Sequence, residues 1–129
     1  MSPTSRSLAL LRKQGYTAQV VEKWNMWSKT RVDLFGVIDI IAIHPDYRGC
    51  LGVQATSRGH INARKKKIEE EPRAKLWLEC GNRLEIWGWG KMKKSGKWEV
   101  KIIQVVSPLV PGGVFFRQTS IGGARRKSK

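Results

Sequence analysis

Apolar and polar positions along the first quarter of the chain predict a helix, a strand and a loop. Residues 4–14 place Leu8 and Leu11 on one helical face and end at a glycine, which predicts a short helix. Residues 16–24, YTAQVVEKW, are rich in β-branched and aromatic side chains and predict a strand. The polar stretch that follows, 25–31, is typical of a loop.

The most apolar segment is LFGVIDIIAI, residues 34–43, which carries one carboxylate, Asp39. The run is continuous, rich in isoleucine and short for a helix, so it predicts the central strand. Residues 44–49 predict a turn, and residues 50–56 predict a returning strand. The two strands would form a hairpin with Asp39 in its buried part.

The second half of the chain begins with a basic segment, 57–71, which predicts a helix that ends before Pro72. Three further strands are predicted at 75–80, 83–90 and 98–106, with glycine-containing turns between them. The predicted order is therefore α-β-β-β-α-β-β-β. This order is typical of one mixed sheet with helices packed on it.

Length and composition agree with a single domain. The chain has 129 residues, 40% of them hydrophobic, and 6 tryptophans, which is enough to build a core. We expect one α/β domain, with a mixed central β-sheet flanked by helices, over residues 1–116. Residues 117–129 are Gly-rich and basic and lack apolar periodicity, so we expect them to form a flexible tail.

Charge is the strongest compositional signal, because the formal net charge is +15. Such a charge indicates a polyanionic partner, above all nucleic acid. No segment reaches the roughly 18 apolar residues of a membrane span, and the N-terminus lacks a secretory signal. Cys50 and Cys80 lack the CxxC spacing of a zinc site or a disulfide framework. We expect a cytoplasmic protein that does not bind a membrane.

Asp39 needs a partner, because a buried ionised carboxylate without one loses several kcal/mol, roughly. Side chains alternate along a strand, so Gln54 and Thr56 share one face of the returning strand. The hairpin places Asp39 across from about Ala55, and a shift of one residue places it beside Gln54 or Thr56. Carboxylate, amide and hydroxyl oxygens together suit a hard cation such as Mg²⁺. The alternative is a structural carboxylate that pairs with a buried arginine or with backbone amides.

The segments FGVIDIIAI and LGVQATS, joined by a turn, resemble the core of the PD-(D/E)XK nuclease superfamily. In that core an Asp on one strand precedes an acidic-x-Lys sequence on the next. The helix and strand before the hairpin, and the helix after it, resemble archaeal-type Holliday-junction resolvases of the superfamily. The resemblance covers roughly residues 4–70. It implies a restriction-endonuclease-like fold, a Mg²⁺ or Mn²⁺ cofactor and hydrolysis of DNA phosphodiester bonds.

Carried over to this chain, the resemblance identifies Asp39 as the metal-binding Asp. Gln54 stands where the second acid is expected, and Thr56 stands where the Lys is expected. Gln54 can still offer an oxygen to a metal, but Thr56 cannot replace the charge of a lysine. The resemblance therefore implies that this charge comes from elsewhere, for example from Arg58, Arg64 or Lys65.

The helix Glu that many family members carry is also missing, so Glu22 or Asp33 would complete the metal shell. The alternative for Glu22 is a solvated carboxylate or the partner of a lysine, and the alternative for Asp33 is a loop carboxylate bound to the backbone or to Arg31. The predicted catalytic residues are Glu22, Asp39, Gln54 and Thr56. The predicted metal ligands are Asp39, Gln54, the carbonyl of Ala55, Glu22 and Asp33.

Basic and aromatic residues near this hairpin predict contacts with nucleic acid. One group lies in the loop at 25–31 and the other in the helix at 57–71. The predicted contacts are Trp27, Lys29, Arg31, Arg58, His60, Arg64, Lys65, Lys66 and Lys67.

The sequence thus predicts a metal-dependent DNA endonuclease, with branched DNA such as a Holliday junction as a candidate substrate. We expect a homodimer, because a junction-cutting nuclease needs two paired sites and this chain offers one. Two alternatives remain open. One is a catalytically degenerate nucleic-acid-binding protein on the same fold, and the other is a structural RNA-binding protein.

Overall fold

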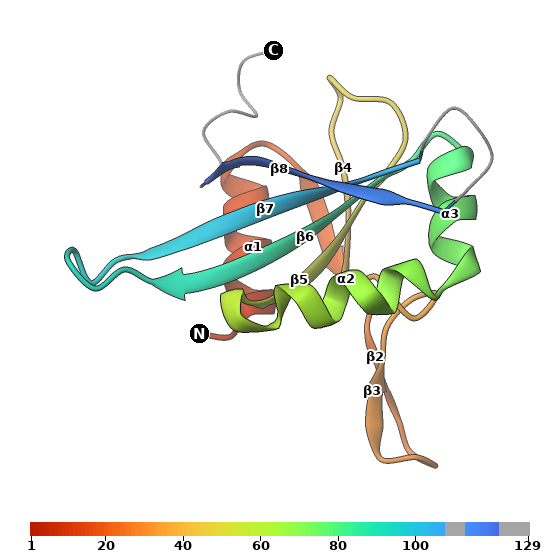
Figure 1. Cartoon of the computed structure of the whole chain (residues 1–129), viewed down its shortest axis with the longest axis horizontal. Helices are drawn as coiled ribbons and strands as arrows, with labels where there is room; N and C mark the ends of the chain where they lie inside the picture. Colours follow the sequence, from red (N-terminus) through yellow and green to blue (C-terminus); the bar gives the residue numbers. More distant parts are fainter. Residues whose placement is uncertain (108–112, 122–129) are drawn as a thin grey trace.

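A computed structural model of the chain describes residues 1–107 and 113–121 (Figure 1). These residues form a single small α/β domain in which three helices flank a mixed six-stranded sheet. The strands of this sheet, in spatial order, are β1 (Thr17–Val20), β4 (Ile40–Ile43), β5 (Leu51–Ser57), β6 (Arg83–Lys91), β7 (Trp98–Val106) and β8 (Phe115–Ile121). Strands β5 and β6 are parallel, and the other neighbours in the sheet are antiparallel.

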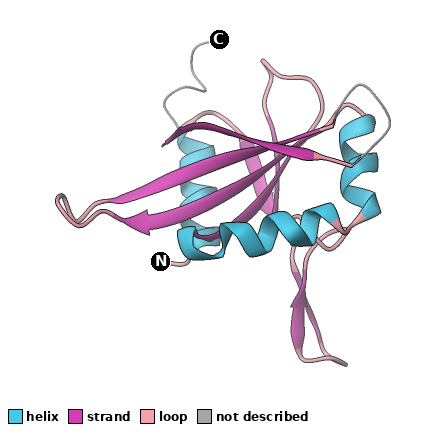
Figure 2. Cartoon of the chain, viewed as in Figure 1, coloured by secondary structure: helices cyan, strands magenta, loops and turns pink. Residues whose placement is uncertain are grey.

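Helices cover both faces of the sheet (Figure 2). Helix α1 (Pro3–Lys13) buries Leu11 against residues of β4, β5 and β6 on one face. Helices α2 (Ile61–Glu69) and α3 (Pro72–Glu79) bury their apolar side chains against the opposite face. A short 3₁₀ helix, η1 (Arg58–His60), connects β5 to α2. The fold class predicted from the sequence is therefore confirmed.

A separate hairpin projects from this body. Strands β2 (Lys23–Asn25) and β3 (Thr30–Val32) pair only with each other and point away from the sheet (Figure 1). The predicted strand at 16–24 is wrong in part, because it is interrupted after Val20, and the predicted loop at 25–31 contributes to both hairpin strands. This hairpin holds two of the candidate site residues at its base.

The predicted strand at 34–43 is wrong over its first half, because β4 begins only at Ile40. Phe35 and Gly36 have positive φ angles of 53° and 77°, and the backbone N–H of Val37 donates to the carbonyl of Leu34 over 3.1 Å. The segment is a tight loop whose apolar side chains fill the core beneath α2 and α3. Its apolar character therefore reflects burial, and the glycine was the signal against a continuous strand.

The predicted strand at 75–80 is wrong, because these residues belong to α3 and its C-cap. Pro72 occupies the first helical position, and the side chain of Glu71 accepts a hydrogen bond from the backbone N–H of Arg73. These are helix-start signals that outweigh the strand-like alternation of KLWLEC. The observed order carries a third helix where the sequence predicted a strand.

The predicted boundary at residue 117 falls inside β8. The guanidinium of Arg117 donates two hydrogen bonds to Gln104 of β7, and Thr119 donates to the carbonyl of Ile102. Residues 117–121 thus continue the sheet, and residues 122–129 of the predicted tail lie outside the described residues. Each of the helices in the described ranges is too short, or too polar, to cross a membrane.

The packing of α2 depends on two glycines of β6. Trp87 and Trp89 point into the core on the α1 side, as the alternation of IWGWG predicts. Gly88 and Gly90 therefore face α2, and a Cβ at Gly88 would overlap Ile61. A Cβ at Gly90 would lie 2.7 Å from Cδ of Arg58. Both glycines let η1 and the start of α2 lie close to the sheet, beside the end of β5.

Candidate metal centre

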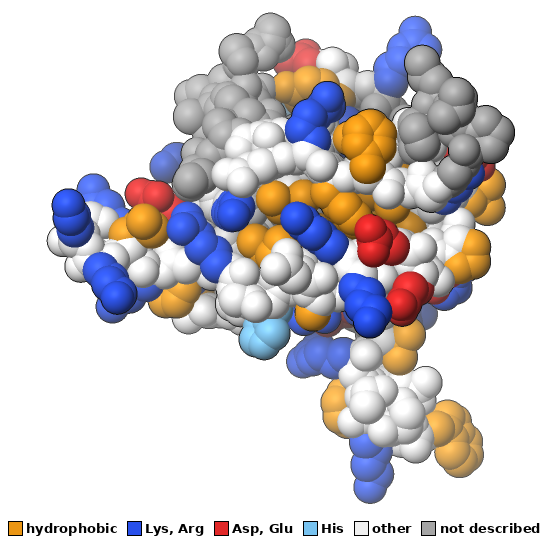
Figure 3. Space-filling model, in the orientation of Figure 1, with side chains coloured by type: hydrophobic (Ala, Val, Ile, Leu, Met, Phe, Trp, Pro, Cys, Tyr) orange, Lys and Arg blue, Asp and Glu red, His pale blue; other side chains and the backbone are white. Residues whose placement is uncertain are grey.

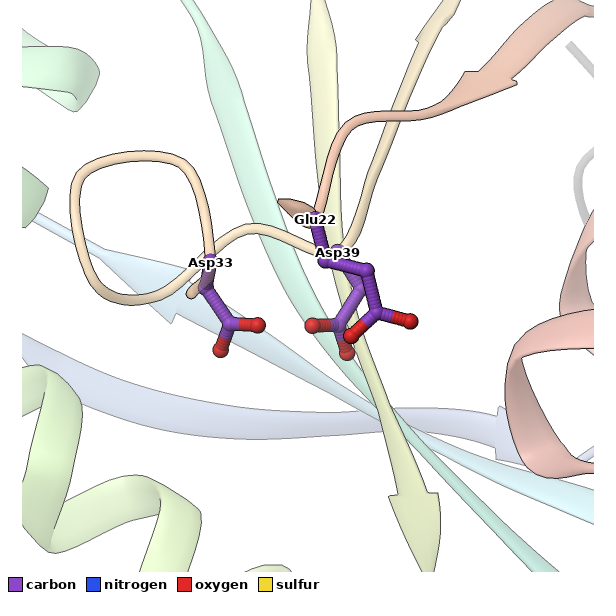
Figure 4. Close-up of side chains that lie close together, drawn as sticks. All are labelled: Glu22, Asp33 and Asp39. Carbon is purple, nitrogen blue, oxygen red and sulfur yellow. The ribbon is translucent and has the colours of Figure 1, made fainter. Parts of the chain in front are cut away.

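Three carboxylates meet at one end of the sheet (Figure 4). Glu22 lies between β1 and β2, Asp33 follows β3, and Asp39 precedes β4. One oxygen from each side chain lies within 4.8 Å of the other two. Negative charges this close repel one another, so bound protons or cations would stabilise the three carboxylates.

The β2–β3 hairpin brings the first two of these acids together. Lys23 pairs with Val32, so Glu22 and Asp33 flank the base of the hairpin on its two strands. The third acid is joined to them through the backbone, because the N–H of Val21 donates to the carbonyl of Asp39 over 2.8 Å. Pairing within residues 20–40 therefore gathers all three acids.

Asp39 is 4% exposed and faces β5. Its Oδ2 accepts hydrogen bonds from Nε2 of Gln54 and from the backbone N–H of Ala55, each over 2.8 Å. The register, with Ile40 opposite Val53, continues to place Asp39 opposite Gln54. Within residues 1–107 and 113–121, these partners are an amide group and a backbone N–H, and no arginine pairs with Asp39.

Asp33 and Glu22 carry basic partners. Nζ of Lys67 lies 2.9 Å from Oδ2 of Asp33, and Nε2 of Gln54 donates to the same oxygen over 3.2 Å. Nη1 of Arg31 lies 3.9 Å from Oε1 of Glu22, which is a long ion pair. The Glu22 side chain is thus the most weakly held of the three acids.

The acids share their protons unequally. Burial, the contact with Asp33 and the negative charge of Asp33 raise the pKa of Asp39 from 3.8 to about 7. Burial also acts to raise the pKa of Asp33, but its contacts with Asp39 and Lys67 outweigh burial and lower it. Near neutral pH the pair therefore carries less than two negative charges, with the proton on Asp39.

Gln54 provides the observation that tests whether a cation fits. Its side chain is 1% exposed and donates through Nε2, while Oε1 is buried without a hydrogen-bond partner in the described part of the chain. An unsatisfied buried carbonyl costs about 1–3 kcal/mol. Rotation of the amide about its last bond exchanges the two atoms and points Oε1 at the acids. A divalent cation would favour that orientation, so the donor set of three carboxylates and one amide oxygen suits Mg²⁺ or Mn²⁺.

The acids line a cavity of about 430 Å³. Its wall includes Gln54, Ala55, Thr56 and Ser57 of β5, and the start of α1 contributes Pro3 and Thr4. Four basic or titratable side chains complete the lining: Arg31, His60, Arg64 and Lys67. A negatively charged floor beneath a positively charged rim suits a cation below and a phosphate above.

Two further predicted site residues of β5, Ala55 and Thr56, line the same cavity. Ala55 contributes its backbone N–H to Asp39, and its carbonyl as a metal ligand stays a prediction. Thr56 is 4% exposed and lines the cavity on the same face as Gln54, as the strand alternation predicts. Its catalytic role also stays a prediction.

The predicted nucleic-acid contacts separate into groups. Arg31, His60, Arg64 and Lys67 line the acidic cavity. Arg58 instead lies against Gly90 and lines a second hollow of about 560 Å³ with lysines of the β6–β7 turn. Lys65 places Nζ 5.7 Å from the centre of the Phe116 ring, and Lys66 is exposed on α2. Trp27 and Lys29 lie in the turn of the β2–β3 hairpin.

The positive charge nearest the acids therefore belongs to Lys67. Sequence reasoning placed Lys67 among the phosphate contacts but considered Arg58, Arg64 and Lys65 for the missing lysine charge. Arg64 lies in the cavity wall, whereas Arg58 and Lys65 point elsewhere. The spacing on α2 gave a signal, because Arg64 and Lys67 are three residues apart and share a helical face.

A hydroxyl–imidazole pair at the rim was also missed. Oγ of Ser57 and Nδ1 of His60 lie 2.8 Å apart. The pair forms because η1 turns the chain directly after β5. The short spacing from Ser57 to His60 was available in the sequence, but only the turn makes it a contact. It fixes the orientation of the imidazole beside the acids.

Comparison of this chain with protein-family models, with curated proteins and with solved structures finds no match.

Proposed function

We propose that this chain is a metal-dependent endonuclease that hydrolyses phosphodiester bonds in DNA. The observation that carries the proposal is the convergence of Glu22, Asp33 and Asp39 within 4.8 Å, beside the amide of Gln54, whose buried Oε1 has no hydrogen-bond partner among the described residues. The resemblance of the hairpin to the PD-(D/E)XK core supports the same reaction. The net charge of +15 supports a polyanionic substrate.

The three carboxylates and Oε1 of Gln54 would hold Mg²⁺ or Mn²⁺, with the carbonyl of Ala55 as a further candidate ligand. A bound divalent ion polarises a phosphodiester and lowers the pKa of a water molecule. The protein's own contribution is to fix these oxygens. The backbone N–H of Ala55 holds Asp39 in place, and the hairpin base holds Glu22 and Asp33.

Lys67 and Arg64 would act on the phosphate. Lys67 lies 2.9 Å from Asp33, at the boundary between the acids and the basic rim, where the negative charge of a transition state would develop. Arg64 lies in the cavity wall, and its Nε is buried without a hydrogen-bond partner among the described residues. A phosphate oxygen would supply that partner. Lys67 thus takes the place of the lysine that the family carries at the position of Thr56.

The Ser57–His60 pair would orient the substrate at the rim. Because Nδ1 of His60 faces Ser57, its other ring nitrogen is available to a phosphate oxygen or a water molecule. The remaining predicted contacts on α2 and the hairpin would bind backbone phosphates farther from the reaction. Branched DNA as a substrate, a homodimer and a cytoplasmic location, where the free Cys50 and Cys80 would stay reduced, belong to the same proposal.

A second candidate is a nucleic-acid-binding protein whose site has lost activity. Two observations favour it: Gln54 brings no charge to the site, and Nζ of Lys67 already partly neutralises Asp33. This protein would bind DNA with the same rim and would need no metal.

A cleavage assay separates the two. The protein is incubated with supercoiled plasmid, single-stranded DNA and a four-way junction, each with Mn²⁺ and with EDTA. The nuclease proposal predicts Mn²⁺-dependent cuts that Asp39→Asn abolishes while DNA affinity is kept. Equal cutting by the wild type and Asp39→Asn would reject the nuclease proposal and indicate a contaminating nuclease. DNA binding without any cutting would reject it in favour of the nucleic-acid-binding protein.

A further inference from the structure

The β2–β3 hairpin exposes apolar side chains that the fold does not use. Trp27 at its turn is 98% exposed, Met26 is 78% exposed and Trp24 is 57% exposed. Figure 3 shows the hairpin as a protrusion with hydrophobic and basic side chains at its end. The ring of Trp27 is therefore left almost fully in water, and a large exposed apolar ring at the end of a protrusion is typical of a binding residue.

The turn that carries Trp27 is ordered by its own hydrogen bonds. Oδ1 of Asn25 accepts from the backbone N–H of Trp27 over 2.9 Å and from that of Ser28 over 3.2 Å. Lys29, with a φ angle of 56°, closes the turn by donating its backbone N–H to the carbonyl of Asn25. The backbone of Trp27 is therefore held in place without help from the body of the protein.

A hollow of about 740 Å³ runs along this hairpin and reaches the candidate metal centre. Three aromatic rings line it, those of Trp24, Trp27 and Phe35. Asp33 lines both this hollow and the acidic cavity, so the two are adjacent. A polymer bound at the metal centre would thus continue into an aromatic hollow.

Charge identifies the class of polymer. Residues 23–32 contain three cations, Lys23, Lys29 and Arg31, and no acid. Arg73 also lines the hollow, but Glu71 holds its guanidinium through two hydrogen bonds, so it adds little net charge. Lys23 and Lys29 have no ion-pair partner among the described residues. Aromatic rings beside such lysines are features that bind single-stranded nucleic acid, because bases stack on the rings and phosphates contact the cations.

We infer that unpaired nucleotides bind in this hollow, with bases stacked on Trp27 and Trp24 and phosphates beside Lys23 and Lys29. The inference deepens the proposed function, on which it rests for the position of the reacting phosphate. It assigns a substrate class to the site: nucleic acid with a single-stranded segment next to the bond that is cut, as at a flap, gap or open junction. Fully paired duplex would leave the aromatic hollow unused.

Binding without cleavage tests this inference separately from the nuclease proposal. The full chain is titrated in EDTA with three probes of equal length: a single strand of thymidines, the same strand with abasic sites, and a blunt duplex. Tryptophan fluorescence and fluorescence anisotropy report binding. The variants are Trp27→Ala, Trp24→Ala and, as the matched control, Trp98→Ala, whose ring is 44% exposed at the start of β7.

The wild type is expected to bind the thymidine strand about tenfold more tightly than the abasic strand, since each stacked base contributes strongly to affinity. Trp27→Ala and Trp24→Ala should each reduce that preference several-fold, with little change for the duplex, and Trp98→Ala should leave it intact. Equal affinity for thymidine and abasic strands in the wild type would overturn the inference. Hairpin variants that keep the preference for the thymidine strand would also overturn it. So would hairpin variants whose only effect is to convert a dimer to monomers in sedimentation, because the hairpin would then contact a second copy of the chain.

The two proposals fail in different ways. If the protein prefers the base-bearing strand but never cuts DNA, the binding of unpaired nucleotides stands and the nuclease proposal fails. A chain that cuts DNA with Mn²⁺ but shows no preference for exposed bases keeps the nuclease and loses the inference.

Discussion

Nε2 of Gln54 donates a hydrogen bond to Oδ2 of Asp39 over 2.8 Å, at the centre of the candidate site. The contact leaves Oε1 of the same amide buried without a partner in the described residues. With the N–H of Gln54 pointing at Asp39, the pair suits a site that holds no cation and in which Asp39 is protonated or only partly charged. The same pair with the amide rotated suits a cation.

Gln54→Glu should strengthen metal binding. The substitution adds a fourth carboxylate, at the position where the PD-(D/E)XK core that the hairpin resembles has an acid, so we expect Mn²⁺ affinity to rise about tenfold or more, which corresponds to at least about 1.4 kcal/mol. Calorimetric titration measures the change. Gln54→Met, of similar volume but without an oxygen, is the control and should weaken binding. Equal Mn²⁺ affinity in the Glu and Met variants would show that residue 54 does not face the ion.

Asp39→Asn should stabilise the metal-free protein at high pH. The pKa of Asp39 is raised from 3.8 to about 7 in the folded protein, so the unfolded chain releases this proton at a lower pH than the folded protein does. The free energy of unfolding therefore falls as the pH rises from about 4 to about 7. The asparagine accepts from Gln54 and Ala55 and donates to Asp33, as the protonated acid does. We expect a gain in unfolding free energy of a few kcal/mol at pH 8 in EDTA, at about 1.36 kcal/mol per pKa unit.

Urea unfolding at pH 8 and at pH 4 measures this effect. At pH 4 the acid is largely protonated in the folded state, so the advantage of asparagine should shrink. A loss of stability at pH 8 would mean that Asp39 is held by a favourable charge interaction rather than by a proton.

Lys67→Ala should reduce cleavage more than it reduces metal binding. Its Nζ is 2.9 Å from Asp33 and lies at the rim where the phosphate would bind, so its loss removes a positive charge from the transition state. We expect a fall of about a hundredfold in the single-turnover rate with Mn²⁺ affinity unchanged or higher, because Asp33 loses a competing cation. Lys75→Ala, on α3, changes the net charge equally and serves as the control. Matching effects of the two variants would reduce Lys67 to a general electrostatic role.

Gly88→Ala should destabilise the fold, because its Cβ would overlap Ile61 at the start of α2. We expect a loss of about 1–3 kcal/mol, typical of overpacking in a core. Gly59→Ala is a matched control, since no atom lies within 4 Å of its added Cβ. Thermal unfolding of the two variants measures the difference. Equal stability of both variants would mean that α2 moves away from the sheet without cost.

The sequence predicted the position of Asp39 opposite β5 because a hairpin register is set by its turn and by strand alternation. It also placed Gln54 and Thr56 on one face of β5. These features depend on neighbours close in the chain. The sequence predicts a strand in place of helix α3 because KLWLEC alternates like a strand, although Glu71 and Pro72 just before it are helix-start signals.

The assembly of the acids was only partly predictable. Glu22 and Asp33 were alternatives in the sequence, and the structure brings both to Asp39 because β2 and β3 pair between them. Lys67 was one basic residue among several on α2, and the packing of Ile61 and Ile68 in the core determines which of them faces the acids. The face that α2 turns to the acids is set by contacts with a strand distant in the chain, and local patterns carry little information on it.

The central claim is that a divalent cation replaces the proton on Asp39. Calorimetric titration of the metal-free protein with Mn²⁺ at pH 6 and pH 8 tests it most directly. The account predicts saturable Mn²⁺ binding with proton release. Below the pKa of Asp39, which is about 7, the affinity should rise by up to about tenfold for each unit of increase in pH. The binding should be lost in Asp39→Asn. No saturable heat in the wild type, or the same binding curve in Asp39→Asn, would contradict it.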